Sequence, residues 1–505
     1  MSPLGRQATL ACVLMLAAAS ARPAIVPAVV PMRFAPADLR ADLQIIRQSL
    51  EEGSPGLYRH TSPAEFDRVC QRAMAAVNRP LTALEFYRIA APVVAAVKNG
   101  HTHLSLPEAE DHALDQVIPL LPLGVRVLGG RIFVVRDFSG LQPTIAGSEV
   151  LAVDGVAAPR LIARMLAVVS ADGDVMTSRS RIISGLGFDY RLFTVFGFRD
   201  RFTLSLRSAQ GARRDAAVAG LPGKILTERW SQRYPADLDA GARRPFALRF
   251  FDGDRIALLV IPHWDEVVDA QRKTSIRTFF ASVFGDLRAK NSQALIIDVR
   301  DNGGGDDMYA ALLVSYLVDA PFRFFDDIWM KGLSFGFLRY ASADYRQGET
   351  TTLPKDVTDM AELGGDGRYH LVKLPYWGIQ QPSAPGFHGR VLLLSNGNSF
   401  STSTEFSAFL SSHHRAEVVG EEGSGYWRAN TSGVEPTLTL PTSKLRLTVP
   451  LLEFDSAVND GTPGAHGVLP DHEVTYTVDD LLAGTDKDLE VALRLARATP
   501  PSPPA

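Results

Sequence analysis

The sequence predicts a multidomain α/β protein built around a layered sheet. Three observations carry this prediction. The chain has 505 residues, which suggests about three domains at roughly 150 residues each. Apolar residues recur at helical spacing near the N-terminus, change to strand spacing in the middle, and after about residue 245 form buried strands that alternate with helices. Such alternation is typical of a sheet that helices cover on its faces.

An N-terminal helical domain is expected over residues 34–110. Its first helix is marked by apolar residues at helical spacing: Leu39, Leu43, Ile46 and Leu50. A second helix follows Pro63. Thr82 and Glu85 form a capping-box pattern that opens a third helix. Because proline cannot donate a backbone hydrogen bond, we expect this third helix to bend or end near Pro92.

A small β-rich domain is expected over residues 115–220. Strand patterns at 124–128 and 131–136 are joined by two glycines, and residues 146–155 read as a strand followed by a turn. A short helix at 159–168 and a strand at 202–207 complete the region. This order resembles a PDZ-like peptide-binding module, and another kind of small β domain is the alternative.

An α/β core is expected over residues 245–497. It begins with a hairpin at 247–261, a long helix over about 267–289 and a buried strand at 294–299. Strands at 390–394, 416–419 and 445–449, and helices at 308–317 and 402–410, continue the pattern. Residues 320–388 are rich in aromatic side chains and interrupt it, so we expect them to form an arm or cap.

Composition narrows the class of protein. The 52 basic and 56 acidic residues give a net charge of −4, so there is no basic excess to neutralise nucleic acid. No apolar run reaches the ~18 residues of a membrane span, which argues against an integral membrane protein. Arg6, a short apolar run at 8–19 and the small residues at 19–21 predict a signal peptide over residues 1–21, and hence a periplasmic or secreted protein.

Three short segments carry residues suited to chemistry. Residues 298–305 leave a buried strand and end in three glycines, which expose backbone N–H groups. Ser401 follows another buried strand and opens a helix, where N–H groups are unpaired; plain N-capping is the alternative. His101 and His103 follow the third helix, but no acidic or cysteine partner lies at ligand spacing, so we expect no metal.

Together these segments resemble the C-terminal processing (tail-specific) serine peptidases, a family that includes the tricorn protease. The family patterns are matched in order at residues 100–102, 298–305, 399–406, 419–425 and 467–471. The resemblance covers about residues 35–497 and implies a tail-specific-protease core of the crotonase/ClpP-like α/β type. It also implies peptide or unfolded-protein substrates and no cofactor.

The resemblance assigns roles to particular residues. Ser401 would be the nucleophile, and the backbone N–H groups of Gly304 and Thr402 would form the oxyanion hole. One branch of the family takes its base from a lysine about 25 residues after the serine, but residues 421–430 contain no lysine. The base would then be His101, as in the tricorn-like branch, and an ordinary histidine pKa near 6.5 suits that role.

The group that orients this histidine is not assigned by the sequence. Gly464 stands where tricorn-like enzymes have a glutamate, and the nearby polar candidates are Asp455, Asp460 and His466. The sequence therefore predicts a secreted or periplasmic serine-type endopeptidase. A catalytically degenerate peptide- or lipid-binding module on the same scaffold is the alternative. Nucleotide binding by the glycines is disfavoured, because Asp306 and Asp307 would repel a phosphate there.

Overall fold

Three helices open the part of the chain that the computed structural model describes, namely residues 32–234, 245–269, 274–459 and 464–498. The helices are α1 (Pro36–Gly53), α2 (Pro63–Ala76) and α3 (Ala83–Ala95). Ser62 and Thr82 both close complete capping boxes, which confirms the predicted helix starts. Pro92 lies inside α3, which continues to its end at Ala95. The predicted signal peptide lies outside the described residues.

The next sheet along the chain is antiparallel, with five strands in sequence across it and a short sixth strand at its side. Its order is β3-β4-β5-β7-β8, with β6 (Val156–Ala157) paired to β5. The strands and the helices packed on them are β3 (Leu123–Leu128), β4 (Arg131–Asp137), β5 (Glu149–Val153), β7 (Arg201–Arg207), β8 (Arg213–Ala219), α5 (Ala158–Leu166), α6 (Met176–Ile182) and α7 (Gly185–Phe196). The apolar residues of this sheet and its helices form a cluster of their own. The predicted strands and short helix of this region are confirmed.

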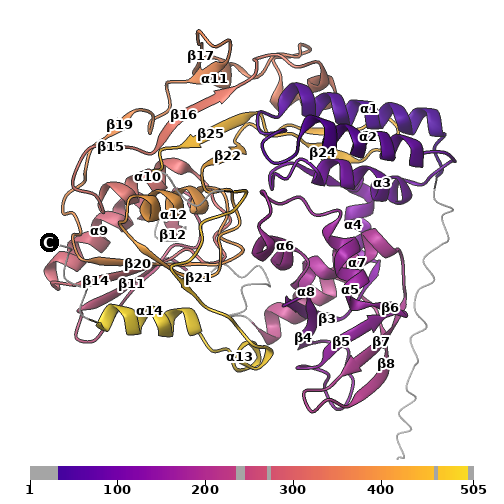
Figure 1. Ribbon diagram of the computed structural model, residues 1–505, viewed down its shortest axis with the longest axis horizontal. Coiled ribbons are helices and arrows are strands. Elements are labelled where there is room, and N and C mark those ends of the chain that lie inside the picture. Colours follow the sequence, from indigo (N-terminus) through magenta and orange to yellow (C-terminus); the bar gives the residue numbers. More distant parts are fainter. Residues whose placement is uncertain (1–31, 235–244, 270–273, 460–463, 499–505) are drawn as a thin grey trace, which may run out of the picture. The chain divides into compact units, whose positions relative to one another are not determined.

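The main sheet has six strands and is parallel except at β10. In sheet order they are β10 (Ala247–Phe251), β11 (Ile256–Val260), β14 (Ala294–Asp298), β20 (Arg390–Ser395), β21 (Glu417–Gly420) and β26 (His472–Glu473). In Figure 1, α9 (Ile276–Ala289), α10 (Asp307–Ser315) and α12 (Thr402–Ser412) cover one face and α14 (Lys487–Arg497) covers the other.

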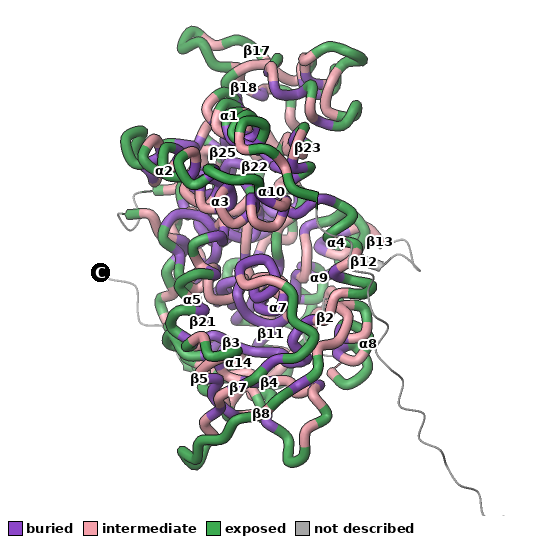
Figure 2. Tube along the Cα trace, turned by 90° about the vertical axis from the view of Figure 1, so that its right-hand side faces the viewer, coloured by how far each residue is buried: buried purple, intermediate pink, exposed green. Residues whose placement is uncertain are grey.

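Side-chain alternation explains this layering. In β11, Ala257 and Leu259 join the core under α9 and α12, whereas Ile256 and Leu258 join a second cluster under α14. A strand buried on both faces has no polar face, so it reads as a continuous apolar run. Figure 2 shows β11 buried in the interior, whereas β8 is exposed at the surface.

One predicted helix begins later than expected. We predicted a helix over 267–289, but β12 (Val267–Asp269) pairs with β13 (Thr274–Ser275), and α9 starts only at Ile276. The side chain of Ser275 accepts a hydrogen bond from the Thr278 N–H and so caps the helix at this point. Helical spacing of apolar residues does not mark the start of a helix as sharply as such a cap does.

The aromatic segment contributes to a second sheet. Its order is β17-β18-β16-β25-β22, formed by β16 (Phe325–Met330), β17 (Ala361–Leu363), β18 (Tyr369–Leu371), β22 (Ala429–Ser432) and β25 (Leu452–Ser456). Phe324 and Phe325 are buried in the main core, so this segment packs into the protein and does not merely cover it.

The predicted strand at 445–449 exists but does not join the main sheet. It is β24 (Arg446–Thr448), and it pairs with β1 (His103–Ser105) and β23 (Thr437–Thr439). This pairing brings the histidine segment against the C-terminal half of the chain. No helix in the described residues is long and apolar enough to cross a membrane.

Candidate active site

Ser401 lies at a sharp turn between the buried strand β20 and helix α12. Its backbone angles are φ 55° and ψ −127°, a conformation that costs a non-glycine residue about 1–3 kcal/mol. Its side chain makes no capping hydrogen bond, so the plain N-cap alternative does not describe this serine. The next residue, Thr402, begins the helix, where N–H groups lack intrahelical acceptors and the helix dipole favours negative charge.

The glycine loop packs directly on this serine. Gly304 has φ +112°, and a Cβ added there would lie 2.7 Å from the Cβ of Ser401 and 3.2 Å from its Oγ. The Gly304 N–H donates to Asn302 Oδ1 at 2.9 Å, and the Phe400 N–H donates to the carbonyl of Asn302 at 3.0 Å. The structure thus brings Gly304, Ser401 and Thr402 together. The Gly304 N–H, however, is already engaged within the loop.

Gly304 and the neighbouring Gly303 provide a matched pair of positions for testing how the loop packs on Ser401. Gly304→Ala would force a methyl group against Ser401 in an unfavourable backbone conformation. Since displacing a reacting group by about 1 Å costs on the order of 10²-fold, we expect kcat to fall by at least about that factor. Gly303→Ala is the control, because nothing lies within 4 Å of a Cβ at that position. Equal losses in the two variants, measured as kcat with melting temperatures, would show that the loop does not position the serine.

The charged residues of the glycine-loop motif hold the core together. Arg300 forms ion pairs with Asp298 at 2.8 Å, Asp486 at 2.6 Å and Asp488 at 3.0 Å. These contacts tie the end of β14 to the C-terminal helix α14. Asp298 and Arg300 therefore anchor the start of the glycine loop.

His101 lies beside the nucleophile segment but is not bonded to Ser401. Its ring stacks on Phe400 with centroids 4.5 Å apart, and its buried Nδ1 has no hydrogen-bond partner. No hydrogen bond joins His101 to Ser401 within the described residues. Burial disfavours the imidazolium and lowers the pKa of His101 to about 3, with His103 acting in the same direction. The expectation of an ordinary pKa near 6.5 is therefore wrong for His101 in this buried position. The ring is neutral at ordinary pH, which is the form that accepts a proton, but it is a weaker base than an exposed histidine.

His103 has a different environment. Its Nδ1 lies 3.2 Å from the carbonyl oxygen of His101, and its Nε2 lies 3.2 Å from Thr448 Oγ1 on β24. Both ring nitrogens thus have partners that hold β1 in place. Of the two histidines, the structure places His101 nearer the serine segment and engages His103 elsewhere.

Asp172 fixes the segment before His101, a role that the sequence did not suggest. Its Oδ1 accepts from the Gly100 N–H at 2.6 Å and its Oδ2 accepts from the Tyr426 N–H at 3.0 Å. Only 3% of Asp172 is exposed, and burial raises its pKa. In the sequence, Asp172 lies in an ordinary turn pattern far from both partners, so no local signal could have found it.

Asn430 links Ser401 to a pair of carboxyl groups. Its Nδ2 lies 3.3 Å from Ser401 Oγ and 2.9 Å from Glu405 Oε1. Burial and the neighbouring charge of Asp307 raise the pKa of Glu405 well above its usual range, which favours its protonated form, and burial also raises the pKa of Asp307. Asp307 in turn accepts from Thr402 Oγ1 at 2.6 Å. The chain of contacts therefore runs from Ser401 through Asn430, Glu405 and Asp307 to Thr402, the residue that follows the serine.

The nearby groups considered for orienting the histidine are engaged elsewhere or not described. Asp455 accepts from Trp329 Nε1 at 3.1 Å, and His466 Nδ1 lies 3.4 Å from Glu422 Oε1 without a hydrogen bond. Asp460 lies outside the described residues. Glu405 lies inside the motif at 399–406, whereas Asp307 was noted only as a carboxylate that would repel a phosphate beside the glycines. Asn430 carried no signal beyond its place at the end of the segment without lysine.

A strained serine at a strand-to-helix turn is typical of serine hydrolases built on an α/β sheet. Residues 255–474 match the model of Peptidase family S41. This match, on a mixed α/β core that fits the fold of that family, identifies the chain as a serine peptidase.

Solved structures share this fold at low sequence identity. Mature CPAF aligns over 91% of this chain and 98% of its own, with 16% identity and a TM-score of 0.62. Mature CPAF complexed with lactacystin aligns over 92% and 98%, also with 16% identity and with a TM-score of 0.63. At this identity the likeness establishes the fold alone. No curated protein sequence matches the chain.

Proposed function

We propose that the protein is a serine endopeptidase that cleaves peptides or unfolded proteins through an acyl-enzyme on Ser401. The observation that carries this proposal is the strained, uncapped Ser401 between the glycine loop and the start of α12. Strain held at one residue by the surrounding fold is typical of functional sites. The peptidase family match of residues 255–474 supports the same reaction class.

The reaction then follows from the positions of these groups. Ser401 Oγ attacks the peptide carbonyl carbon, and its proton passes to His101, which is neutral and becomes a stronger base once it leaves the buried position that lowers its pKa. The oxyanion that forms is stabilised by the backbone N–H groups of Thr402 and Gly304. The protonated histidine gives its proton to the leaving amine, and water later releases the acyl group from Ser401.

Two adjustments precede this reaction. His101 has to move from its stack on Phe400 toward Ser401, since apo structures often show long or missing catalytic hydrogen bonds. The Gly304 N–H has to be shared between Asn302 Oδ1 and the oxyanion. Substrate binding beside the Gly100–His103 segment is the event that we propose to drive the first of them.

A fluorophosphonate probe tests the proposal, because only an activated serine reacts with it. We expect covalent labelling that Ser401→Ala abolishes and Ser411→Ala, in the last turn of the same helix, leaves unchanged. A folded protein that resists labelling would favour the alternative, a degenerate peptide- or lipid-binding module on the same scaffold.

Asn430 is expected to tune the nucleophile. Its amide donates to Ser401 Oγ, which leaves the serine hydroxyl proton free to point toward the base. Removing one hydrogen bond of this kind costs about 0.5–1.5 kcal/mol, so Asn430→Ala should lower kcat by roughly 2- to 15-fold with little change in KM. Glu405→Gln is the control and should leave kcat unchanged, because a glutamine side chain can still accept from Asn430 as the protonated carboxyl does. A change confined to KM in Asn430→Ala would contradict this role.

We further propose that residues 115–220 form a PDZ-like module that binds peptide C-termini. Support comes from the separate apolar cluster of this region and from β8, an edge strand whose exposed backbone could accept a further strand. Deleting the module would also remove Asp172, so the test uses substrates instead. Amidating the C-terminus of a long peptide should raise KM, whereas amidating the C-terminus of a peptide too short to reach the module should not; equal effects would contradict recognition.

Export is the remaining part of the proposal. A signal peptide over residues 1–21 would direct the chain to the periplasm or the exterior. The N-terminal sequence of the protein purified after expression should then begin at Arg22. A mature protein that still begins at Met1 in the cytoplasm would contradict export and leave the peptidase proposal intact.

A further inference from the structure

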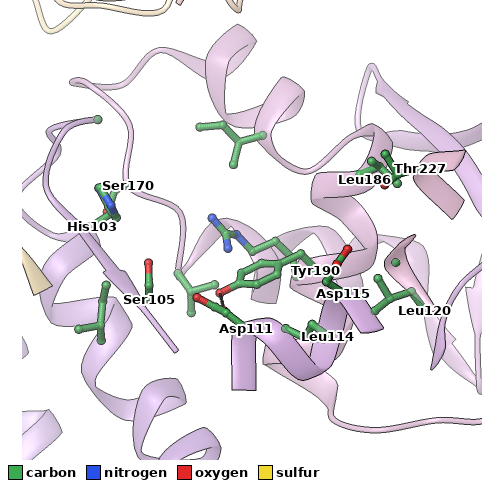
Figure 3. A pocket seen from close by; sticks show the side chains of 16 residues that line it. His103, Ser105, Asp111, Leu114, Asp115, Leu120, Ser170, Leu186, Tyr190 and Thr227 are labelled. Atoms are coloured by element: carbon green, nitrogen blue, oxygen red, sulfur yellow. Dashed lines mark hydrogen bonds between the residues drawn. The ribbon is translucent and has the colours of Figure 1, made fainter. Parts of the chain in front are cut away.

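A cavity of about 680 Å³ opens beside the segment that carries the histidines. Gly100 and His103 line one end of it, and much of the remaining wall comes from helices α4 (Glu108–Gln116), α7 and α8 (Gly223–Arg233). Leu120, Val168, Ser170 and Ile182 line it from outside these helices. Figure 3 shows His103 and Ser170 at one end, Leu120 and Thr227 at the other, and Tyr190 between them. Cavities of about 300–1,000 Å³ are typical of small-molecule sites.

The lining of this cavity combines apolar and polar groups. Six aliphatic side chains contribute to its wall: Leu104, Leu114, Leu120, Val168, Ile182 and Leu186. The acidic Asp111 on α4 is already neutralised, because it pairs with Arg446 and accepts from Tyr190 Oη at 3.4 Å. The second acid, Asp115, is exposed, so water screens its charge.

Arg191 is the charged group of the wall that lacks an acceptor. Its buried Nε has no hydrogen-bond partner, and its guanidinium pairs with no carboxylate or carbonyl in the described residues. The guanidinium carbon Cζ of Arg191 lies over the ring of Tyr190, 5.0 Å from the ring centroid. Arg415, also partly buried, by contrast donates to three backbone carbonyls. Arg191 as a whole is half-buried, but a buried guanidinium N–H without an acceptor is costly, so an anion that accepts from this Nε would stabilise it.

We propose that this cavity binds a small ligand with a carboxylate on an apolar body, with the carboxylate on Arg191 and the apolar part against the leucines. The planar fork of a guanidinium matches a carboxylate with two parallel hydrogen bonds. The site is separate from Ser401 and goes beyond the proposed peptidase reaction, but its occupant would contact Gly100 and His103.

Such a carboxylate has two sources, the end of a peptide or a free acid, and calorimetric titration with matched probes distinguishes them. Hexanoate is compared with 1-hexanol, and N-acetyl-L-leucine with N-acetyl-L-leucinamide. A hydrogen bond to a charged group contributes about 1.5–3 kcal/mol, so each acid should bind the wild-type protein roughly 10- to 150-fold more tightly than its neutral partner. The acid with the lower Kd identifies the source.

Variants assign the preference to this cavity. Arg191→Gln should remove the preference for the acids, and Arg201→Gln, an exposed arginine on β7, should leave it unchanged. Thr227→Trp, at the far end of the cavity, should weaken acid and neutral probe alike. If Arg191→Gln does not fold, Arg191→Lys retains the charge without the fork and should reduce the preference. Equal binding of acid and neutral probes to the wild type, no binding of either, or a preference that survives Arg191→Gln would overturn the proposal.

Discussion

Ser401→Ala is expected to abolish peptidase activity and leave the fold intact. Losing the nucleophile of a serine peptidase lowers kcat by up to about 10⁶-fold. The structural cost is small, because the Ser401 side chain caps nothing and Asn430, which donates to it, keeps its second bond to Glu405. Activity is measured as kcat on an unfolded protein substrate, and folding as the melting temperature.

The outcome for this variant separates chemistry from structure. Retained activity per folded molecule, or a melting temperature that falls with activity, would show that Ser401 acts through the fold. Ser411→Ala, on the same helix, is the control and should change neither measurement.

His101→Ala should lower kcat by about 10²–10⁴-fold, the usual size of a lost acid–base contribution. Alanine also removes the stack on Phe400, and aromatic pairs contribute about 0.5–1.5 kcal/mol. His101→Phe therefore accompanies it, since phenylalanine keeps a ring against Phe400 but cannot accept a proton. Both variants should lose activity, whereas only the alanine variant should lose stability.

His103→Ala is the matched control for this histidine. Its ring nitrogens contact the His101 carbonyl and Thr448, so we expect a much smaller loss of kcat than at His101. Full activity in His101→Ala, or inactivation that follows modification of a lysine, would contradict the assignment of the base.

Burial also sets the pH range in which His101 works. The imidazole accepts a proton only when it is neutral, and its pKa is lowered from 6.5 to about 3. Activity should therefore persist as the pH falls below 6.5 and decline only as the pH approaches the lowered pKa. The acidic limb of kcat/KM should have a midpoint below 6.5 that disappears in His101→Phe. A midpoint at or above 6.5 would show that the histidine titrates as a solvated group.

Local sequence patterns predicted most elements because those elements depend on neighbouring residues. The capping boxes at Ser62 and Thr82 and the apolar runs of β11 and β14 need no distant partner to be recognised. The start of α9 and the partner of β24 were not predictable in this way. The β12–β13 pair delays the start of α9, and the pairing of β24 with β1 places β24 outside the main sheet. The register of a strand pair depends on both of its strands and not on local spacing alone.

The sequence by itself determined the serine-peptidase class, through motifs whose residues are close together along the chain: the three glycines at 303–305, the segment around Ser401, and the histidines. Only the tertiary structure decided how these segments meet. It placed Asp172 on Gly100, Asn430 on Ser401 and Phe400 under His101, across separations of up to about 300 residues. It also lowered the pKa of His101, because the removal of an imidazole from water is a property of the packed fold and not of its neighbours in sequence.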